Sequence, residues 1–209
     1  MTTFAKRERF AIAQTLRNLG PDAPTLCSDW KSFDLLAHLV NRENRPDSAL
    51  GLIIPAFSSY SNKIATESKN RGFENLVKEF EDGPKIYSPF SIPGVDRLAN
   101  TFEFLVHHED LLRGESNYTP RVISEADKKF LWKQFTRSAK FFMLKAKVGI
   151  VAKSDQGTYT VKTGNNSVTI SGEVVELILF AFGRKSAAQV EFTGDESAIN
   201  TLKQTKFGF

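Results

Sequence analysis

The chain has 209 residues, a mass of 23.4 kDa and a formal net charge of +4. This length suits one large domain or two small ones, and an apolar fraction of 41% is enough to build a hydrophobic core. The most apolar stretch, residues 174–182, is interrupted by Glu176, so we expect no membrane span. No secretory apolar segment follows the basic residues near the N-terminus, so we expect a cytoplasmic protein.

The cysteine content and the distribution of charge argue against further classes of protein and of binding site. A single cysteine, Cys27, excludes an internal disulfide and a cysteine-based metal cluster. Residues 1–120 carry 14 Lys and Arg against 16 Asp and Glu, whereas residues 121–209 carry 14 against 8. Because the basic residues of the second half are scattered and follow no nucleic-acid-binding motif, we expect no nucleic-acid partner.

The first half of the sequence has helical periodicity. Apolar spacing predicts four main helical segments: residues 4–19, 33–44, 47–82 and 95–112. Ser32 is the expected N-cap of the second segment, and Pro55 and Gly72 interrupt the third. Residues 83–94 contain three prolines and predict an irregular loop. Gly114 stands where the C′ glycine of the last helix is expected.

In the second half of the sequence, the spacing of apolar residues changes from a helical period to a mixture of helical and strand periods. The pattern predicts three helices, over 124–145, 173–182 and 195–203, and four short strands. The strands over 147–153, 158–162 and 167–170 are expected to be antiparallel, and a fourth strand covers 189–193. The sequence therefore predicts an α+β protein with two domains, residues 1–118 and residues 119–209.

Two of the three histidines lie on helix faces that apolar neighbours turn towards the core. In the segment 95–112, Glu103, His107 and Asp110 fall within roughly 60° of one another around the helix axis. Buried polar groups are costly unless they are paired or bind a metal. With His38 from a facing helix, Glu103 and His107 form a set of two histidines and one carboxylate, which fits a catalytic zinc or a ferrous site with one open position.

Two carboxylates have the spacing that supports such ligands. Asp34 stands four residues before His38, and Asp110 stands three after His107, so each can accept a hydrogen bond from a non-ligating ring nitrogen. The alternative is a pair of core histidines bonded to carboxylates without any metal. His108 points about 100° away from His107 and is expected at the surface or between helices. The segment lacks the second histidine of a zinc-protease helix, which excludes that chemistry.

Several segments in combination resemble the mycothiol-dependent maleylpyruvate isomerase family, within the wider DinB-like group. The resemblance lies in residues 26–30 (LCSDW), 34–39 (DLLAHL) and 103–110 (EFLVHHED) for the helical half, and in residues 168–172 and 182–184 for a domain similar to sterol carrier proteins. Residues 42–47 and 106–110 also resemble an actinobacterial metal-binding subfamily whose substrate is uncharacterised. The resemblance covers nearly the whole chain.

This resemblance implies a DinB-like four-helix bundle followed by a small α+β domain that resembles sterol carrier proteins. It further implies that His38, Glu103 and His107 bind a divalent metal, usually zinc, and that the open site takes a low-molecular-weight thiol such as mycothiol. A metal lowers the pKa of a coordinated thiol and holds the thiolate beside an electrophile. The implied activity is that of a metal- and thiol-dependent isomerase or S-transferase.

The sequence leaves the remaining site residues open. If the electrophile carries a carboxylate, Arg184, Arg42 and Arg45 are candidates to bind it, although each is also an ordinary arginine of a surface or helix end. Cys27 lies in a short loop without an evident histidine partner and is expected to be a buried structural thiol. The sequence identifies no catalytic residue.

Two other functional interpretations remain. In one, the protein is a non-enzymatic module, stabilised by the metal, whose α+β half binds a small apolar ligand. In the other, the polar cluster is a metal-free part of the core. The expected partners are a small-molecule thiol and an electrophile, and the protein is expected to be a monomer or a homodimer.

Overall fold

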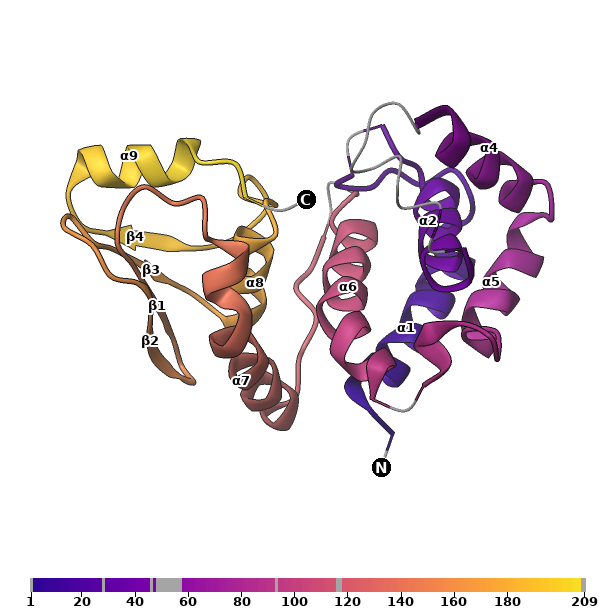
Figure 1. The fold of residues 1–209 in the computed structure, drawn as a ribbon, viewed down its shortest axis with the longest axis horizontal. Coiled ribbons are helices and arrows are strands. Elements are labelled where there is room, and N and C mark those ends of the chain that lie inside the picture. The colour runs from indigo at the N-terminus through magenta and orange to yellow at the C-terminus, as the bar shows by residue number, and fades with distance from the viewer. Residues whose placement is uncertain are drawn as a thin grey trace. The chain divides into compact units, whose positions relative to one another are not determined.

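The computed structural model describes residues 2–27, 29–45, 47, 58–92, 94–115 and 118–207. The chain divides into two compact units, Met1–Thr119 and Pro120–Phe209. Within the described residues it has eight α-helices, a short 3-10 helix and a four-stranded sheet (Figure 1). The expected mixture of helices and a sheet is confirmed.

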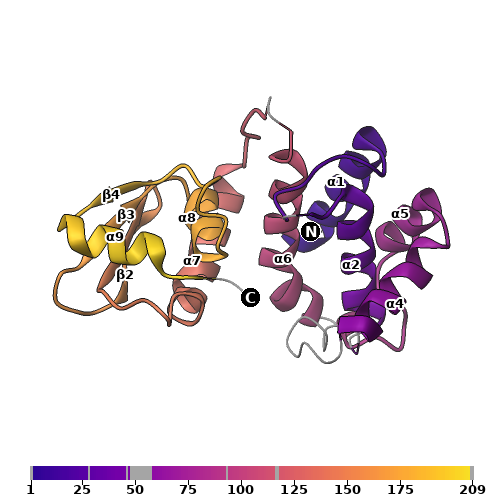
Figure 2. The ribbon, with the colours of Figure 1, turned by 90° about the horizontal axis from the view of Figure 1, so that it is seen from above.

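The first unit is helical (Figure 2). Its helices are α1 (Phe4–Leu19), α2 (Ser32–Asn44), α4 (Ser58–Lys69), α5 (Phe73–Asp82), the 3-10 helix η3 (Pro89–Ser91) and α6 (Val95–Leu112). Helix α1 packs against α5 and α6, and α2 packs against α4 and α5. Their apolar faces meet in one core, which includes Ile12, Leu16, Leu36, Leu39, Phe80 and Phe104. Among the described helices, none is both long and apolar enough to cross a bilayer.

The third predicted segment, residues 47–82, is interrupted at Gly72 as expected. Helix α4 ends at Lys69, and α5 begins at Phe73 after Gly72, whose φ of +88° lies in the left-handed region that favours glycine. Pro55, the other expected interruption, and Pro93 of the following loop lie outside the described residues. The N-cap of α2 is Lys31 and not Ser32, the residue expected from the sequence.

Gly114 has a different role from the one its position suggests. A Cβ atom added there would lie 2.0 Å from the carbonyl oxygen of Pro24, so the loop before α2 approaches the end of α6 more closely than any other residue type allows. The backbone N–H of Leu26 donates to the carbonyl oxygen of Asp110 at 3.0 Å and holds the loop in this place. Glycine is therefore required here by close packing.

We expect Gly114→Ala to lower the free energy of unfolding by about 1–3 kcal/mol, because the new methyl group overlaps backbone atoms of the loop. Urea denaturation measures this change. Gly72→Ala is the control, since a Cβ at Gly72 meets only the Asn75 side chain, at 3.8 Å, and the change acts through φ alone. Only Gly114→Ala should increase the reactivity of Cys27 towards a thiol reagent. Equal reactivity in both variants would contradict this explanation.

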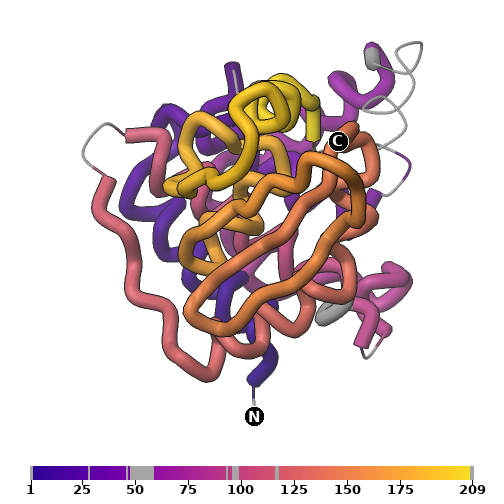
Figure 3. Tube along the Cα trace, turned by 90° about the vertical axis from the view of Figure 1, so that its left-hand side faces the viewer, coloured from indigo at the N-terminus to yellow at the C-terminus, as the bar shows by residue number. Residues whose placement is uncertain are grey.

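The second unit combines three helices with a mixed sheet. Its elements are α7 (Glu125–Phe142), β1 (Ile150–Ser154), β2 (Gly157–Lys162), β3 (Val168–Ser171), α8 (Val174–Ala181), β4 (Glu191–Thr193) and α9 (Glu196–Gln204). The strand order is β2-β1-β3-β4. Helix α7 contacts α8 and β2, and α9 contacts β3; the strands can be followed in the Cα trace of Figure 3.

The prediction that the first three strands are antiparallel is wrong for one pair. Strands β1 and β2 form an antiparallel hairpin, but β3 returns along the other edge of β1 and pairs with it in parallel, Ile150 opposite Val168. Alternation of apolar residues fixes which face of a strand is buried and not the direction of its neighbour. The charge within the apolar helix α8 has a local explanation, because the Glu176 carboxylate accepts the backbone N–H of Gln189 at 2.8 Å.

Candidate metal centre

The structure brings His38, Glu103 and His107 together. His38 projects from α2, and Glu103 and His107 lie one turn apart on α6, whose residues Phe104 and Leu111 are fully buried. The Nε2 atoms of His38 and His107 lie 3.2 and 3.3 Å from the same oxygen, Oε1 of Glu103. One ligand atom from each residue lies within 4.8 Å of the others.

These atoms form a donor set that fits a metal ion. Ligand atoms about 2.0–2.2 Å from a tetrahedral zinc ion are spaced about 3.3–3.6 Å apart, close to the observed separations from Glu103. The three side chains remain 18%, 21% and 11% exposed, so the cluster is partly accessible to solvent. Among the described residues, two imidazoles and one carboxylate would leave one position of a four-coordinate ion open.

When no metal is bound, the protonation states of the three side chains set the charge of the cluster. Burial opposes ionisation of Glu103, but hydrogen bonds from His107 and His38 and the charge of Arg42 hold its pKa well below the usual value. Burial alone would lower the pKa of His107, yet hydrogen bonds to Asp110, Cys27 and Glu103 raise that pKa well above 6.5. Burial lowers the pKa of His38 despite its bond to Glu103. An ionised Glu103 therefore faces a protonated His107 and a neutral His38.

This protonation pattern predicts the pH dependence of metal binding. A cation at Nε2 of His107 must displace a proton from a ring whose pKa is raised, so below that raised pKa the metal affinity should fall up to about tenfold per pH unit. His38 and Glu103 need lose no proton at neutral pH. Calorimetric titration in buffers of different ionisation enthalpy should show about one proton released per ion at pH 7. Binding without proton release would contradict the assignment.

Asp110 occupies the position that the sequence predicts for it. Its fully buried carboxylate lies 2.9 Å from Nδ1 of His107 through Oδ2. A hydrogen bond at Nδ1 orients the ring and leaves Nε2 turned towards Glu103.

Asp34 makes contacts other than the one predicted. Its Oδ2 accepts the backbone N–H of Lys31 at 3.0 Å, and its Oδ1 pairs with Nζ of Lys69 at 2.7 Å. A carboxylate in the first helical turn stabilises the helix N-terminus, and this local role takes the side chain away from His38. The ring of His38 instead packs against Trp30, with centroids 5.2 Å apart.

The three candidate arginines have different surroundings. Nε of Arg42 lies 3.3 Å from Oε1 of Glu103, and its guanidinium also donates to Asn100. Arg45, at the end of α2, pairs with Asp47 at 2.8 Å and is 45% exposed. Arg184 lies in the second unit and donates to the carbonyl oxygen of Phe182 at 2.9 Å. Of the three, the structure places Arg42 in contact with the candidate ligands.

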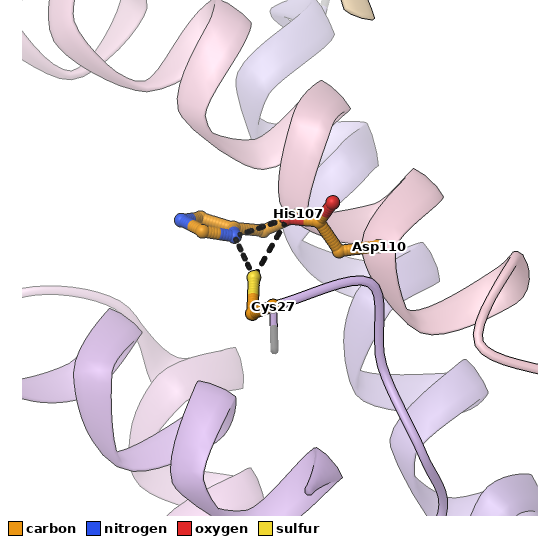
Figure 4. Close-up of side chains that lie close together, drawn as sticks. All are labelled: Cys27, His107 and Asp110. Carbon is orange, nitrogen blue, oxygen red and sulfur yellow. Dashed lines mark hydrogen bonds and ion pairs between the residues drawn. The ribbon is translucent and has the colours of Figure 1, made fainter. Parts of the chain in front are cut away.

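Cys27 has a histidine partner that the sequence did not reveal. Its Sγ lies 3.1 Å from Oδ2 of Asp110 and 3.9 Å from Nδ1 of His107 (Figure 4). The contact forms because the loop before α2 folds back onto the end of α6. A loop residue has no periodicity that shows where it points, so no signal within the sequence could have identified this contact.

His108 is a structural histidine between helices, the second of its two expected positions. Its Nδ1 lies 2.9 Å from Oε1 of Glu8, and its Nε2 lies 2.9 Å from Oγ1 of Thr15, both on α1. It is only 4% exposed. His108 therefore joins α6 to α1 and is a control position for the other two histidines.

Comparison with solved structures identifies the fold. The chain is similar to the crystal structure of the mycothiol-dependent maleylpyruvate isomerase, with a TM-score of 0.58 and 17% identity over 92% of this chain and 96% of that one. The chain has a maleylpyruvate isomerase-like fold. A mutant of the isomerase matches with the same TM-score and coverage at 16% identity. No protein-family model and no curated protein matches the sequence. The likeness to the isomerase extends over most of both chains, helical and sheet-containing units alike.

Proposed function

We propose that this protein binds a divalent metal, with zinc as the expected ion, through His38, Glu103 and His107. We further propose that the open coordination position takes a low-molecular-weight thiol, such as mycothiol, for an isomerase or S-transferase reaction. The observation that carries the proposal is the convergence of two imidazole nitrogens on one carboxylate oxygen in a partly exposed cluster. The maleylpyruvate isomerase-like fold supports the thiol and the small-molecule electrophile as substrates.

The bound metal would lower the pKa of the coordinated thiol, so that the thiolate would be present at neutral pH. The protein's own residues would fix the geometry. Asp110 keeps the His107 ring oriented, and it is itself held by the loop that contains Cys27. Trp30 packs on His38 and forms an aromatic wall beside it. This support leaves the ligand atoms little rotational freedom, which favours one coordination geometry.

Arg42 is the residue that we propose to bind an acidic electrophile. Its planar guanidinium is stacked over the ring of Phe90 at 4.9 Å and already contacts the carboxylate of Glu103. The guanidinium geometry matches a substrate carboxylate, which would lie next to the bound thiol. Arg184 of the second unit, which we propose to be a sterol carrier-like domain, remains a candidate substrate-binding residue.

The test is the rate at which the metal-loaded protein adds a thiol to an unsaturated dicarboxylate. We expect the rate enhancement to disappear in His38→Ala and to persist in His108→Asn, which alters a buried histidine outside the cluster. If His38→Ala loses its metal and the thiol reaction never exceeds background even in the wild type, the protein is a metal-stabilised module and not an enzyme. If Arg42→Lys raises KM for the dicarboxylate and leaves a neutral electrophile unaffected, the role of Arg42 is supported.

A further inference from the structure

A second group of potential ligands lies on the opposite edge of the His107 ring. Cys27 Sγ, His107 Nδ1 and Asp110 Oδ2 are separated by 3.1 Å (S to O), 2.9 Å (N to O) and 3.9 Å (S to N) (Figure 4). His107 and Asp110 are buried, and Cys27 is partly exposed. The group is therefore buried on the side of α6 and partly exposed at Cys27.

This donor set differs from that of His38, Glu103 and His107 because it contains a sulfur atom. A thiolate, an imidazole nitrogen and a carboxylate oxygen suit zinc, and the thiolate favours softer cations such as Cd²⁺ and Cu⁺. With metal–ligand distances of about 2.0–2.3 Å, a tetrahedral ion separates its ligands by about 3.3–3.6 Å. The observed separations lie on both sides of this range, so shifts of less than about 1 Å suffice.

Charge balance also favours a cation at this point. The thiol of Cys27 donates a hydrogen bond to Oδ2 of Asp110, and Nδ1 of His107 lies within hydrogen-bond distance of the same oxygen. A divalent cation that enters between them displaces the thiol proton and the Nδ1 proton to solvent. Two protons leave and one divalent cation arrives, so the net charge is unchanged and no electrons are transferred. The buried carboxylate of Asp110 keeps a positive neighbour.

We propose that Cys27, His107 and Asp110 form a second cation site, selective for thiophilic metals, which competes with the first site for the ring of His107. Nε2 of His107 faces Glu103, and Nδ1 faces Cys27 and Asp110. A cation at Nδ1 leaves the proton of the neutral ring on Nε2, where it blocks the first site. The competition rests on the proposed function, whereas the binding of a thiophilic cation does not.

Cadmium is the probe for binding, because a thiolate–Cd²⁺ bond gives a charge-transfer absorption in the ultraviolet. We expect this absorption at about one Cd²⁺ per chain in the full-length protein and in Glu103→Ala, which lacks the first site. It should be absent in Cys27→Ser. In Asp110→Asn, which keeps the thiol, the Cd²⁺ affinity should fall at least about tenfold. An unchanged affinity in Asp110→Asn would mean that a lone thiol binds the ion and would overturn the proposal.

Zinc release tests the competition separately. Protein loaded with one equivalent of Zn²⁺ is mixed with Cd²⁺, and free zinc is measured with a chromogenic chelator. We expect Cd²⁺ to release zinc from the wild type at concentrations at least about tenfold lower than from Cys27→Ser. Equal release from both would overturn the competition. If the wild type never retains zinc but Glu103→Ala still gives the thiolate–Cd²⁺ absorption, the proposed function fails and the second site stands.

Discussion

Glu103→Gln is expected to weaken divalent-metal binding at least about 100-fold, the largest functional effect of any single change that we predict. The amide keeps the size of the side chain but removes the negative charge that both imidazoles and Arg42 approach. A metal ion at this point would then have two neutral nitrogens and no anionic ligand. Isothermal titration with Zn²⁺ measures the affinity.

Two aspartates provide the matched comparison. Asp110→Asn should weaken Zn²⁺ binding by about 10–100-fold, because the amide no longer accepts the proton at Nδ1 of His107 as a carboxylate does. Asp34→Asn should leave the affinity within about threefold, since Asp34 bonds the backbone N–H of Lys31 and pairs with Lys69. The sequence assigned both aspartates the same role, so equal losses in the two variants would contradict the contacts that the structure gives to Asp34.

Arg9→Met is expected to lower the free energy of unfolding by about 3–5 kcal/mol, the largest stability effect that we predict. Arg9 and Glu43 form a bidentate ion pair at 2.6 and 2.7 Å, with side chains only 5% and 2% exposed. Arg9 also donates to the carbonyl oxygen of Phe80 and stacks over two aromatic rings. Removal of the guanidinium leaves a carboxylate charge in the core with one amide partner, Asn100.

Chemical denaturation of three variants tests this prediction. The double change Arg9→Met with Glu43→Leu should recover much of the lost stability, because no charge is then left in the core. Lys31→Met, which breaks an ion pair between exposed side chains, should have no measurable effect. If Arg9→Met is no more destabilising than Lys31→Met, the buried pair contributes nothing to stability. Because Asn100 bonds both Glu43 and Arg42, the Arg9–Glu43 pair also helps to hold Arg42 beside the candidate metal centre.

Sequence reasoning located the candidate ligands because helical geometry is regular. Glu103, His107 and Asp110 share one face at spacings of four and three residues, and the apolar neighbours of that face direct it inwards. From the sequence, Arg42 and Arg45 have equal standing, whereas in the structure Arg42 lies one turn after His38 and Arg45 is the C-cap of α2. Regular periodicity also predicted most helix and strand positions in both units.

The features that sequence reasoning missed depend on contacts between distant segments. Cys27 reaches His107 because Gly114 admits the loop against the end of α6, and nothing in residues 23–31 encodes that contact. Asp34 has the spacing for His38, but its place in the first helical turn gives it a nearer partner. The parallel pairing of β1 with β3 depends on the path of the chain after β2, on which alternation has no influence.

X-ray absorption on protein prepared without chelators, combined with elemental analysis, tests whether His38, Glu103 and His107 hold a metal ion. We expect about one divalent ion per chain, coordinated by two imidazole nitrogens and a carboxylate oxygen, and no such ion in Glu103→Gln. A wild-type chain that remains free of metal in the presence of excess zinc, or an ion that stays bound in Glu103→Gln with unchanged ligands, would contradict this expectation.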